Sequence, residues 1–183
     1  MKTCLITTKT YQNHDNGHGH PENANRVTSI NIAIDNIKNT EWVKTKNFST
    51  KIIGLAHDKK YIEKVNKSFP NNGLAFLDSD TIVSHGSKQA SYDAVNSVLT
   101  AIDKVQDGSY QNAFVSIRPP GHHAHSNFAA GFCIFNNIAI GACYLVKNYN
   151  LKRVLILDWD VHRGDGTAEI ISNKENIFLI SSH

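Results

Sequence analysis

The sequence lacks a long apolar run, a block of basic residues and any closely spaced pair of cysteines. Its apolar runs, such as residues 154–157, fall far short of the roughly 20 residues that a membrane-spanning helix needs. Polar residues follow the first few positions, where a signal peptide would carry its apolar segment. The three cysteines form no CxxC pair, so neither a disulfide framework nor a cysteine zinc site is predicted. We therefore expect a cytoplasmic protein with no membrane contact.

Charge and composition do not indicate a particular binding partner, but they do indicate a folded domain. The net charge of +3 comes from scattered lysines, which argues against direct nucleic-acid binding. With 40% hydrophobic and 19% charged residues, residues 1–183 have the composition of a single globular domain. Histidine stands out, with ten residues. They include one cluster at His122, His123 and His125 and a second group at residues 14–20, and such clusters are candidates for chemistry.

The hydrophobic pattern predicts an α/β fold with a mostly parallel sheet between helices. Unbroken apolar runs indicate strands covered on both faces, as in a three-layer parallel sheet. Periods of three and four residues indicate helices. The expected strands are residues 4–8, 51–55, 113–117, 153–158 and 177–181, and the expected helices are residues 21–38, 57–68, 87–105 and 135–149.

The segment DWDVHRGDG predicts a metal site at the end of the strand 153–158. Asp158, Asp160 and His162 are spaced by two residues, so in an extended backbone their side chains point the same way. Open α/β sheets place ligands at the carboxyl ends of their strands. A carboxylate and an imidazole are ordinary ligands of first-row metals. The alternative is that the two aspartates only cap the following turn.

The segment RPPGHHAH follows another predicted strand and so emerges at the same edge of the sheet. The prolines before His122 and His123 stiffen the turn, which suits imidazoles that transfer protons. Taken alone, two adjacent histidines are often ordinary surface residues. Taken with the aspartates of the first segment, each imidazole gains a candidate carboxylate partner that would fix its tautomer.

Together, RPPGHHA, GFCIFNNIAI and VLILDWDVHRGDGT resemble the core of the histone deacetylase superfamily, closest to class II enzymes and their bacterial relatives. HPENANRV and LDSDTIVSHGS extend the resemblance over nearly the whole chain. The resemblance implies an arginase/deacetylase-like fold, of which this chain would hold only part. It also implies a zinc-dependent amidohydrolase that removes acetyl groups from acetylated lysine or polyamine, leaving the choice of substrate open.

The resemblance also assigns roles to individual residues. It implies that Asp160 and His162 are zinc ligands, and that His122 and His123 are the general acid and base, with Asp158 and Asp165 as their carboxylate partners. It places a structural potassium ion near the zinc strand and the acyl-lysine tunnel beside an aromatic residue. The implied potassium ligands are Asp158, Asp160, His162 and Ser181, and the implied tunnel residues are Gly131 and Phe132.

Two departures from the family pattern affect what we expect of this chain. Arg163 stands where the family usually has a second histidine, and we expect its side chain to point away from the metal ligands. Family members also continue past the strand 177–181 and supply there a third zinc ligand and a tyrosine or histidine for the oxyanion. We therefore expect a C-terminally truncated deacetylase domain, with weak zinc binding and little activity alone. A second chain could complete it.

Two other functions compete with this interpretation. A two-manganese ureohydrolase of similar architecture would need a carboxylate two residues after His162, where Gly164 stands. A non-catalytic remnant, or one half of a split deacetylase, would bind a partner or an acylated amine without turnover.

Overall fold

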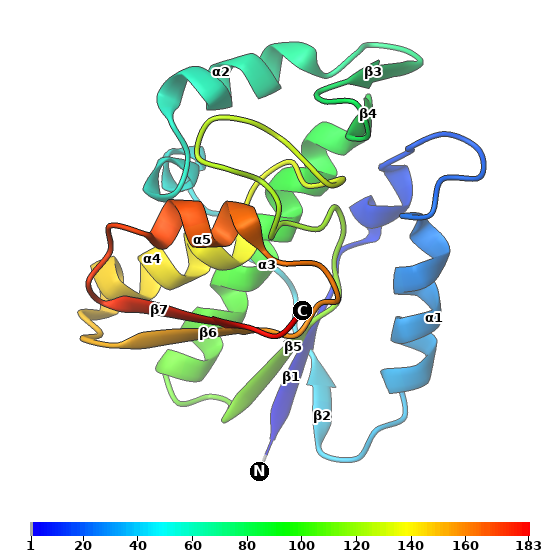
Figure 1. The fold of residues 1–183 in the computed structure, drawn as a ribbon. Helices are drawn as coiled ribbons and strands as arrows, with labels where there is room; N and C mark the ends of the chain where they lie inside the picture. Colours follow the sequence, from blue (N-terminus) through cyan, green and yellow to red (C-terminus); the bar gives the residue numbers. More distant parts are fainter. Residues whose placement is uncertain (1) are drawn as a thin grey trace.

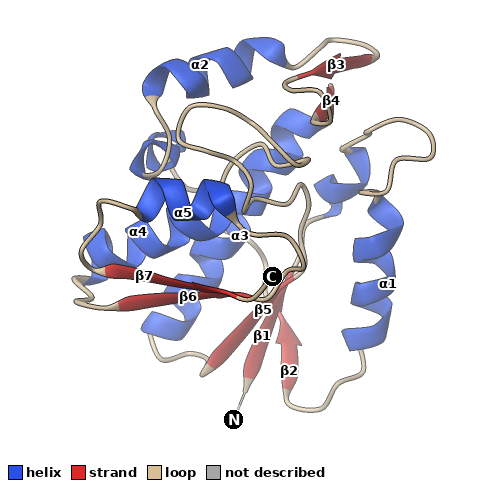
Figure 2. Ribbon diagram, in the orientation of Figure 1, coloured by secondary structure: helices blue, strands red, loops and turns tan. Residues whose placement is uncertain are grey.

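The computed structural model describes residues 2–183 and shows an α/β fold (Figures 1 and 2). Helices and parallel strands alternate along the chain, as the hydrophobic pattern predicts. None of the helices in this part of the chain is long and apolar enough to cross a membrane. The elements are β1 (Thr3–Ile6), η1 (Lys9–Asn13), α1 (Ala24–Ile34), β2 (Thr40–Trp42), η2 (Thr50–Leu55), α2 (Lys59–Ser68), β3 (Leu74–Phe76), β4 (Ile82–Ser84), α3 (Ser87–Gln106), β5 (Asn112–Val115), α4 (Asn137–Tyr149), β6 (Val154–Asp158), α5 (Asp165–Ile171) and β7 (Ile177–Ser181).

The parallel strands form two separate groups. One sheet has the order β2-β1-β5, and the other consists of β6 and β7. Both are parallel, with Cys4 opposite Ala113 in the first sheet and Asp158 opposite Ser181 in the second. The strands β3 and β4 form a short antiparallel pair outside these sheets. The predicted mostly parallel sheet flanked by helices is therefore confirmed.

The main core lies between α3, α4 and the inner face of β6 and β7. Leu99 of α3, Ile140 of α4 and Ile156 of β6 are all buried in it. Gly141 allows the two long helices to approach closely, because a Cβ atom there would lie 2.8 Å from Val98 Cγ1. The helices α4 and α5 lie along one side of β6–β7 (Figure 2).

The other face of β6–β7 is open, which corrects the expectation that these strands are covered on both faces. Within residues 2–183, alternate side chains of both strands face outward. Leu155, Leu157, Phe178 and Ile180 are each 50–59% exposed. The register places Leu155 beside Phe178 and Leu157 beside Ile180, so the four form a continuous apolar surface. We call these four residues the open face.

Several local predictions also need correction. Residues 51–55, expected as a strand, lie in the 3-10 helix η2, and the β2 strand and the β3–β4 pair were not expected. The first helix begins at Ala24 rather than Pro21, because Asn23 caps it by accepting a hydrogen bond from the Asn25 N–H. That helix ends at Ile34, so Ile37 lies outside it and is half exposed.

Candidate active site

Two loops that leave β5 and β6 at their carboxyl ends bring the predicted residues together. The first carries His122 and His123, whose rings lie 4.0 Å apart between centroids. The second carries Asp158, Asp160 and His162. The His122 Nε2 atom lies 4.0 Å from Asp160 Oδ1, and the His123 ring centroid lies 6.0 Å from that of His162. The parallel arrangement of the strands thus gathers side chains that are about 40 residues apart in sequence.

The site contains two imidazole–carboxylate pairs. The first, His122 and Asp158, is better shielded from solvent than the second. His122 Nδ1 lies 3.0 Å from Asp158 Oδ2, and their side chains are 18% and 13% exposed. The other carboxylate oxygen, Asp158 Oδ1, accepts a hydrogen bond from the Asp160 N–H at 3.1 Å. Asp158 is thus held from both sides, and it directs the Nδ1–H of His122 toward itself.

Gly164 packs directly against this pair. A Cβ atom at position 164 would lie 2.3 Å from Asp158 Oδ2 and 3.3 Å from His122 Nδ1. Even an alanine would therefore displace the pair. The position that would need a carboxylate in a two-manganese site is one where the surrounding atoms require glycine.

The second pair, His123 and Asp165, lies nearer the surface. His123 Nδ1 is 2.7 Å from Asp165 Oδ1, which also accepts a hydrogen bond from the Gly166 N–H at 3.0 Å. The Asp165 side chain is 52% exposed. Its partial burial raises the pKa of Asp165, but the hydrogen bond and charge interaction with His123 outweigh that effect and lower it.

The two predicted tunnel residues lie beside the second pair. Gly131 has a φ of +54°, and a Cβ atom there would come within 2.3 Å of the His123 ring, so only glycine fits this contact. The Phe132 ring meets the ring of His20 edge-on, with centroids 4.7 Å apart. Its backbone N–H donates to Thr81 Oγ1 at 3.2 Å. Position 131 thus shapes the contact with the His123 imidazole, whereas the Phe132 ring packs on His20.

Asp160 and His162 form the candidate metal-binding pair. Asp160 Oδ1 lies 3.1 Å from His162 Nδ1 and accepts the His162 backbone N–H at 2.8 Å. That backbone hydrogen bond is the main reason why the pKa of Asp160 lies below its ordinary value. Two donors at this separation suit neighbouring corners of a tetrahedral ion with bonds of about 2.0–2.2 Å. Within residues 2–183, no group of three or more His, Cys, Asp or Glu residues is arranged to hold a metal.

The remaining predicted metal-site residue, Ser181, lies at the same end of the sheet. It stands opposite Asp158 in the β6–β7 register. The Asp158 carbonyl accepts the N–H of the next residue, Ser182, at 2.9 Å. Ser181 Oγ lies 3.3 Å from His183 Nδ1. The residues that the family resemblance implies as potassium ligands are therefore neighbours in space.

A buried histidine that the sequence did not single out anchors the histidine loop. His57 Nε2 accepts the N–H of Asn136 at 2.9 Å, so its Nδ1–H donates to the His125 carbonyl at 2.9 Å. Burial lowers the pKa of His57 to about 4, which keeps the ring neutral and this arrangement intact. The Asn136 side chain adds a hydrogen bond to the Ala124 carbonyl at 3.0 Å, and the Thr167 N–H donates to the His122 carbonyl at 3.0 Å.

A buried arginine holds the start of the same loop. Arg118 is 2% exposed and donates to the carboxylate of Glu22 through Nε and Nη2, at 2.9–3.1 Å. It also donates to the carbonyls of Tyr11 and His14 and to Asn16 Oδ1. Burial raises the pKa of Glu22, but the hydrogen bonds and charge of Arg118 outweigh it and lower that pKa. We call Arg118 with these partners the Arg118 cluster.

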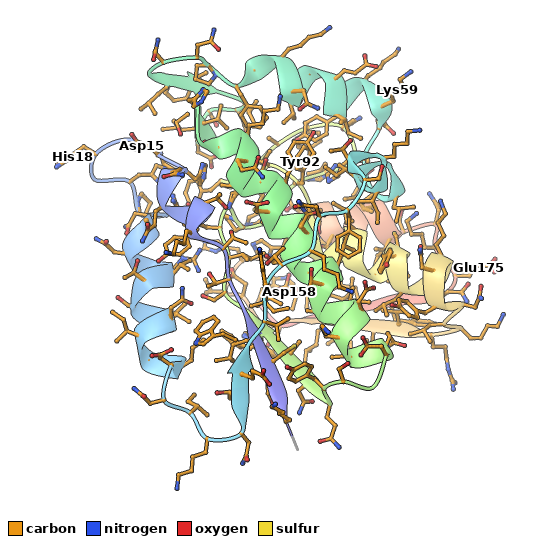
Figure 3. All side chains as sticks on the ribbon, turned by 180° about the vertical axis from the view of Figure 1, so that it is seen from behind. Asp15, His18, Lys59, Tyr92, Asp158 and Glu175 are labelled. Atoms are coloured by element: carbon orange, nitrogen blue, oxygen red, sulfur yellow. The ribbon has the colours of Figure 1, made fainter. Side chains whose placement is uncertain are left out.

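The second histidine group of the sequence does not form one site. His14 is buried against Ser87, at 2.6 Å from Nδ1 to Oγ, and burial lowers its pKa to about 4. His18 projects from the edge of the molecule, whereas Asp158 lies in the interior of the view (Figure 3). His20 packs on Phe132. The three side chains therefore serve different local contacts.

Comparisons with known proteins agree with the fold and the motifs. The protein-family model described as the histone deacetylase domain matches residues 20–183 of this chain. The Synechocystis sp. protein slr0245 is 36% identical over 98% of this chain and 60% of its own length. A probable deacetylase of Archaeoglobus fulgidus is 32% identical over 100% of this chain and 52% of its own. The crystal structure of the HDA15 HD domain superposes with a TM-score of 0.90 at 27% identity, covering 100% of this chain and 54% of that one. The chain thus spans little more than half the length of these matches.

Proposed function

The chain belongs to the histone deacetylase family, and from this premise we propose that it carries the acid–base histidines and two zinc ligands of a deacetylase acting on acetylated amines. One observation carries the proposal. Two imidazole–carboxylate pairs, His122–Asp158 and His123–Asp165, lie beside the Asp160–His162 donor pair at one edge of the sheet. A carbonyl substrate placed there would meet a proton acceptor and a proton donor together.

The two histidines divide the proton transfers between them. Each directs Nδ1 to its carboxylate, so Nε2 is the nitrogen left to exchange protons with the reactants. One ring accepts a proton from the attacking water, and the other donates a proton to the departing amine. The shielded Asp158 and the exposed Asp165 give the rings unlike surroundings, which is how paired groups acquire different tasks.

Asp160 and His162 would hold zinc, which when bound polarises an amide carbonyl and acidifies water. The pair fits two corners of such a site, and we propose that a third donor comes from outside residues 2–183. Potassium would lie beside it, against Asp158, Asp160, His162 and Ser181. The slot for the acylated chain would pass Gly131 and Phe132, because an apolar wall suits a neutral acyl-amine better than a free amine. Acetyl-lysine and acetylpolyamine are the proposed substrates.

The open face favours the hypothesis that another segment packs on it and completes the domain. Strands of parallel sheets are nearly always covered on both sides, and contiguous apolar surfaces mark interaction sites. We propose that this segment packs on Leu155, Leu157, Phe178 and Ile180 and supplies the third metal donor and the oxyanion donor. The chain alone would then bind zinc weakly and have little activity.

Zinc titration of the purified chain tests the metal assignment directly. Replacing His162→Ala is expected to weaken zinc binding about tenfold or more, because it removes one of two donors. His18→Ala is the matched control, since this histidine is exposed and lies away from the site. Calorimetry or competition with a chromophoric chelator measures the zinc affinity of both variants. Equal weakening by the two substitutions would contradict the assignment.

A non-catalytic binder is the second candidate function. The arrangement of only two metal donors within residues 2–183 favours it. An assay with an acetyl-lysine peptide and an acetylpolyamine distinguishes the two functions. It uses this chain joined to the unmatched part of the Synechocystis sp. relative. Binding of either compound without release of acetate would favour the binder, whereas release that His123→Ala abolishes would favour the deacetylase.

A further inference from the structure

Imidazoles and carboxylates alternate between the histidine loop and helix α5. Asp165 and Glu169 are four residues apart on α5, so they share one face of the helix. Two carboxylates at this spacing repel each other unless a donor lies between them. His125 lies there: its Nε2 is 3.5 Å from Asp165 Oδ2, and its Nδ1 is 3.8 Å from Glu169 Oε2. The other oxygen of Asp165 contacts His123.

The His125 ring has a fixed orientation. It stacks on Phe128, with centroids 4.0 Å apart and an angle of 16° between the planes, and its side chain is 15% exposed. The backbone N–H of His125 donates to the Phe128 carbonyl at 3.0 Å, and its own carbonyl accepts from His57. The ring therefore cannot turn away from the two carboxylates without losing its stack.

The carboxylate of Glu169 is fixed from the loop as well. Its Oε2 accepts the Ser126 backbone N–H at 2.9 Å, and its Oε1 accepts the Ser126 hydroxyl at 2.8 Å. Glu169 thus ties α5 to the histidine loop immediately after His125. A ring that touches both carboxylates sets the distance between the loop and this face of α5.

The two catalytic pairs need this support unequally. Asp158 is 13% exposed, and the Asp160 N–H holds its second oxygen at 3.1 Å. Asp165 is 52% exposed, and among the described residues the second oxygen of its carboxylate faces His125. The Gly166 N–H and His123 both contact one oxygen of Asp165, so a contact on its second oxygen is what Asp165 needs for the support that Asp158 already has.

We propose that His125 is a positioning residue: it holds the outer oxygen of Asp165 so that the inner oxygen stays on His123 Nδ1. This inference rests on the proposed function in that His123 is taken as a catalytic acid or base. Its geometry is independent of turnover. His125 would act on the reaction only through Asp165, and its removal would leave His122 and Asp158 unaffected.

Long-range ¹H–¹⁵N NMR of the imidazoles in the metal-free chain tests this, at a pH of about 8 where free imidazoles are neutral. In the unmodified chain, His123 is expected mainly in the Nδ1–H tautomer. His125→Ala is expected to lower the ratio of Nδ1–H to Nε2–H tautomer of His123 about two- to fivefold, the size of one weak hydrogen bond from a neutral imidazole. His122 should keep its spectrum and serves as the control within the molecule.

Two further variants separate hydrogen bonding from packing. His125→Phe keeps the stack on Phe128 but removes both nitrogens, so it should change His123 as much as His125→Ala does. His125→Gln offers Asp165 an amide N–H and should restore part of the tautomer ratio. An unchanged His123 spectrum in His125→Phe would overturn the proposal, as would equal changes at His122 and His123, which would indicate general loosening of the loop. None of these outcomes depends on zinc binding or activity.

Discussion

The loop that carries His122 and His123 and the loop that carries the proposed metal donors, Asp160 and His162, differ in how much protein surrounds them. His122 and His123 are 18% and 19% exposed, and the Arg118 cluster, His57 and Asn136 hold their loop. Asp160 and His162 are 49% and 72% exposed and follow a strand whose outer face is open. The loop with the proposed acid–base histidines is thus preorganised within this chain. The loop with the proposed metal donors has little enclosure.

The largest expected effect concerns the Arg118 cluster, which holds the better-enclosed histidine loop. Arg118→Met would remove a buried donor from two carbonyls and would leave the buried Glu22 carboxylate with only Arg26 and the Asn16 amide, and it should lower the free energy of unfolding by about 3–5 kcal/mol. Arg26→Met is the matched control, because Arg26 pairs with the same carboxylate but is 46% exposed. It should cost less than about 1 kcal/mol. Urea unfolding measures both, and similar losses would remove the distinction between buried and exposed support.

The pH dependence of stability should reflect the buried histidines. The pKa of His57 is about 4 in the folded chain and about 6.5 when unfolded, so the unfolded chain binds more protons between these values. Stability should therefore fall as pH is lowered from about 6.5 toward 4, by about 2–3 kcal/mol for His57 alone. His14, whose pKa is also about 4, acts in the same direction.

Two variants isolate the contribution of His57. Glutamine can replace both of its hydrogen bonds, so His57→Gln should remove part of this slope while the fold is kept. His18→Gln should keep the original profile because that side chain is exposed. Denaturant unfolding at several pH values checks this, and an unchanged slope in His57→Gln would contradict the assignment.

A smaller effect is expected where the two loops meet. Gly164→Ala should cost about 1–3 kcal/mol, since its Cβ atom would overlap Asp158 Oδ2. It should also shift the NMR signals of the His122 ring. Gly54→Ala is the control, because a Cβ atom there meets nothing within 4 Å. A Gly164→Ala variant as stable as Gly54→Ala would show that the Asp158–His122 pair is not closely packed.

The smallest effect concerns the open face. Leu157→Ala should change the stability of the isolated chain by no more than about 0.5 kcal/mol, because its side chain is already 54% exposed. Ile156→Ala, one residue away on the buried face, should cost about 2–5 kcal/mol. In a chain joined to a complementary segment, Leu157→Ala should become costly. If it stays harmless there, that segment does not pack on the open face.

The gathering of the candidate site residues at one edge of the sheet could be predicted because their sequence signals are local. Asp158 ends an apolar strand, and the spacing of two predicts that Asp160 and His162 gather with it at the end of that strand. The backbone bends at residues 160–162 instead of staying extended, and Asp158 and Asp160 each accept the N–H two residues on, so they also cap this turn. The residues that hold them could not be found in this way. His57 and Arg118 act through partners 68 to 107 residues away, and no pattern around either residue indicates such contacts.

Sequence alone determined the α/β class, the family and the residues that gather at the sheet edge, because apolar periodicity and motif spacing are properties of neighbouring residues. Tertiary structure alone decided which faces of the sheet are covered and which carboxylate is shielded. Apolar runs show that β6 and β7 can be buried on both faces, but burial requires a second surface. In the described part of the chain that surface lies on one side of the strands, so Ile156 is buried and Leu157 is exposed.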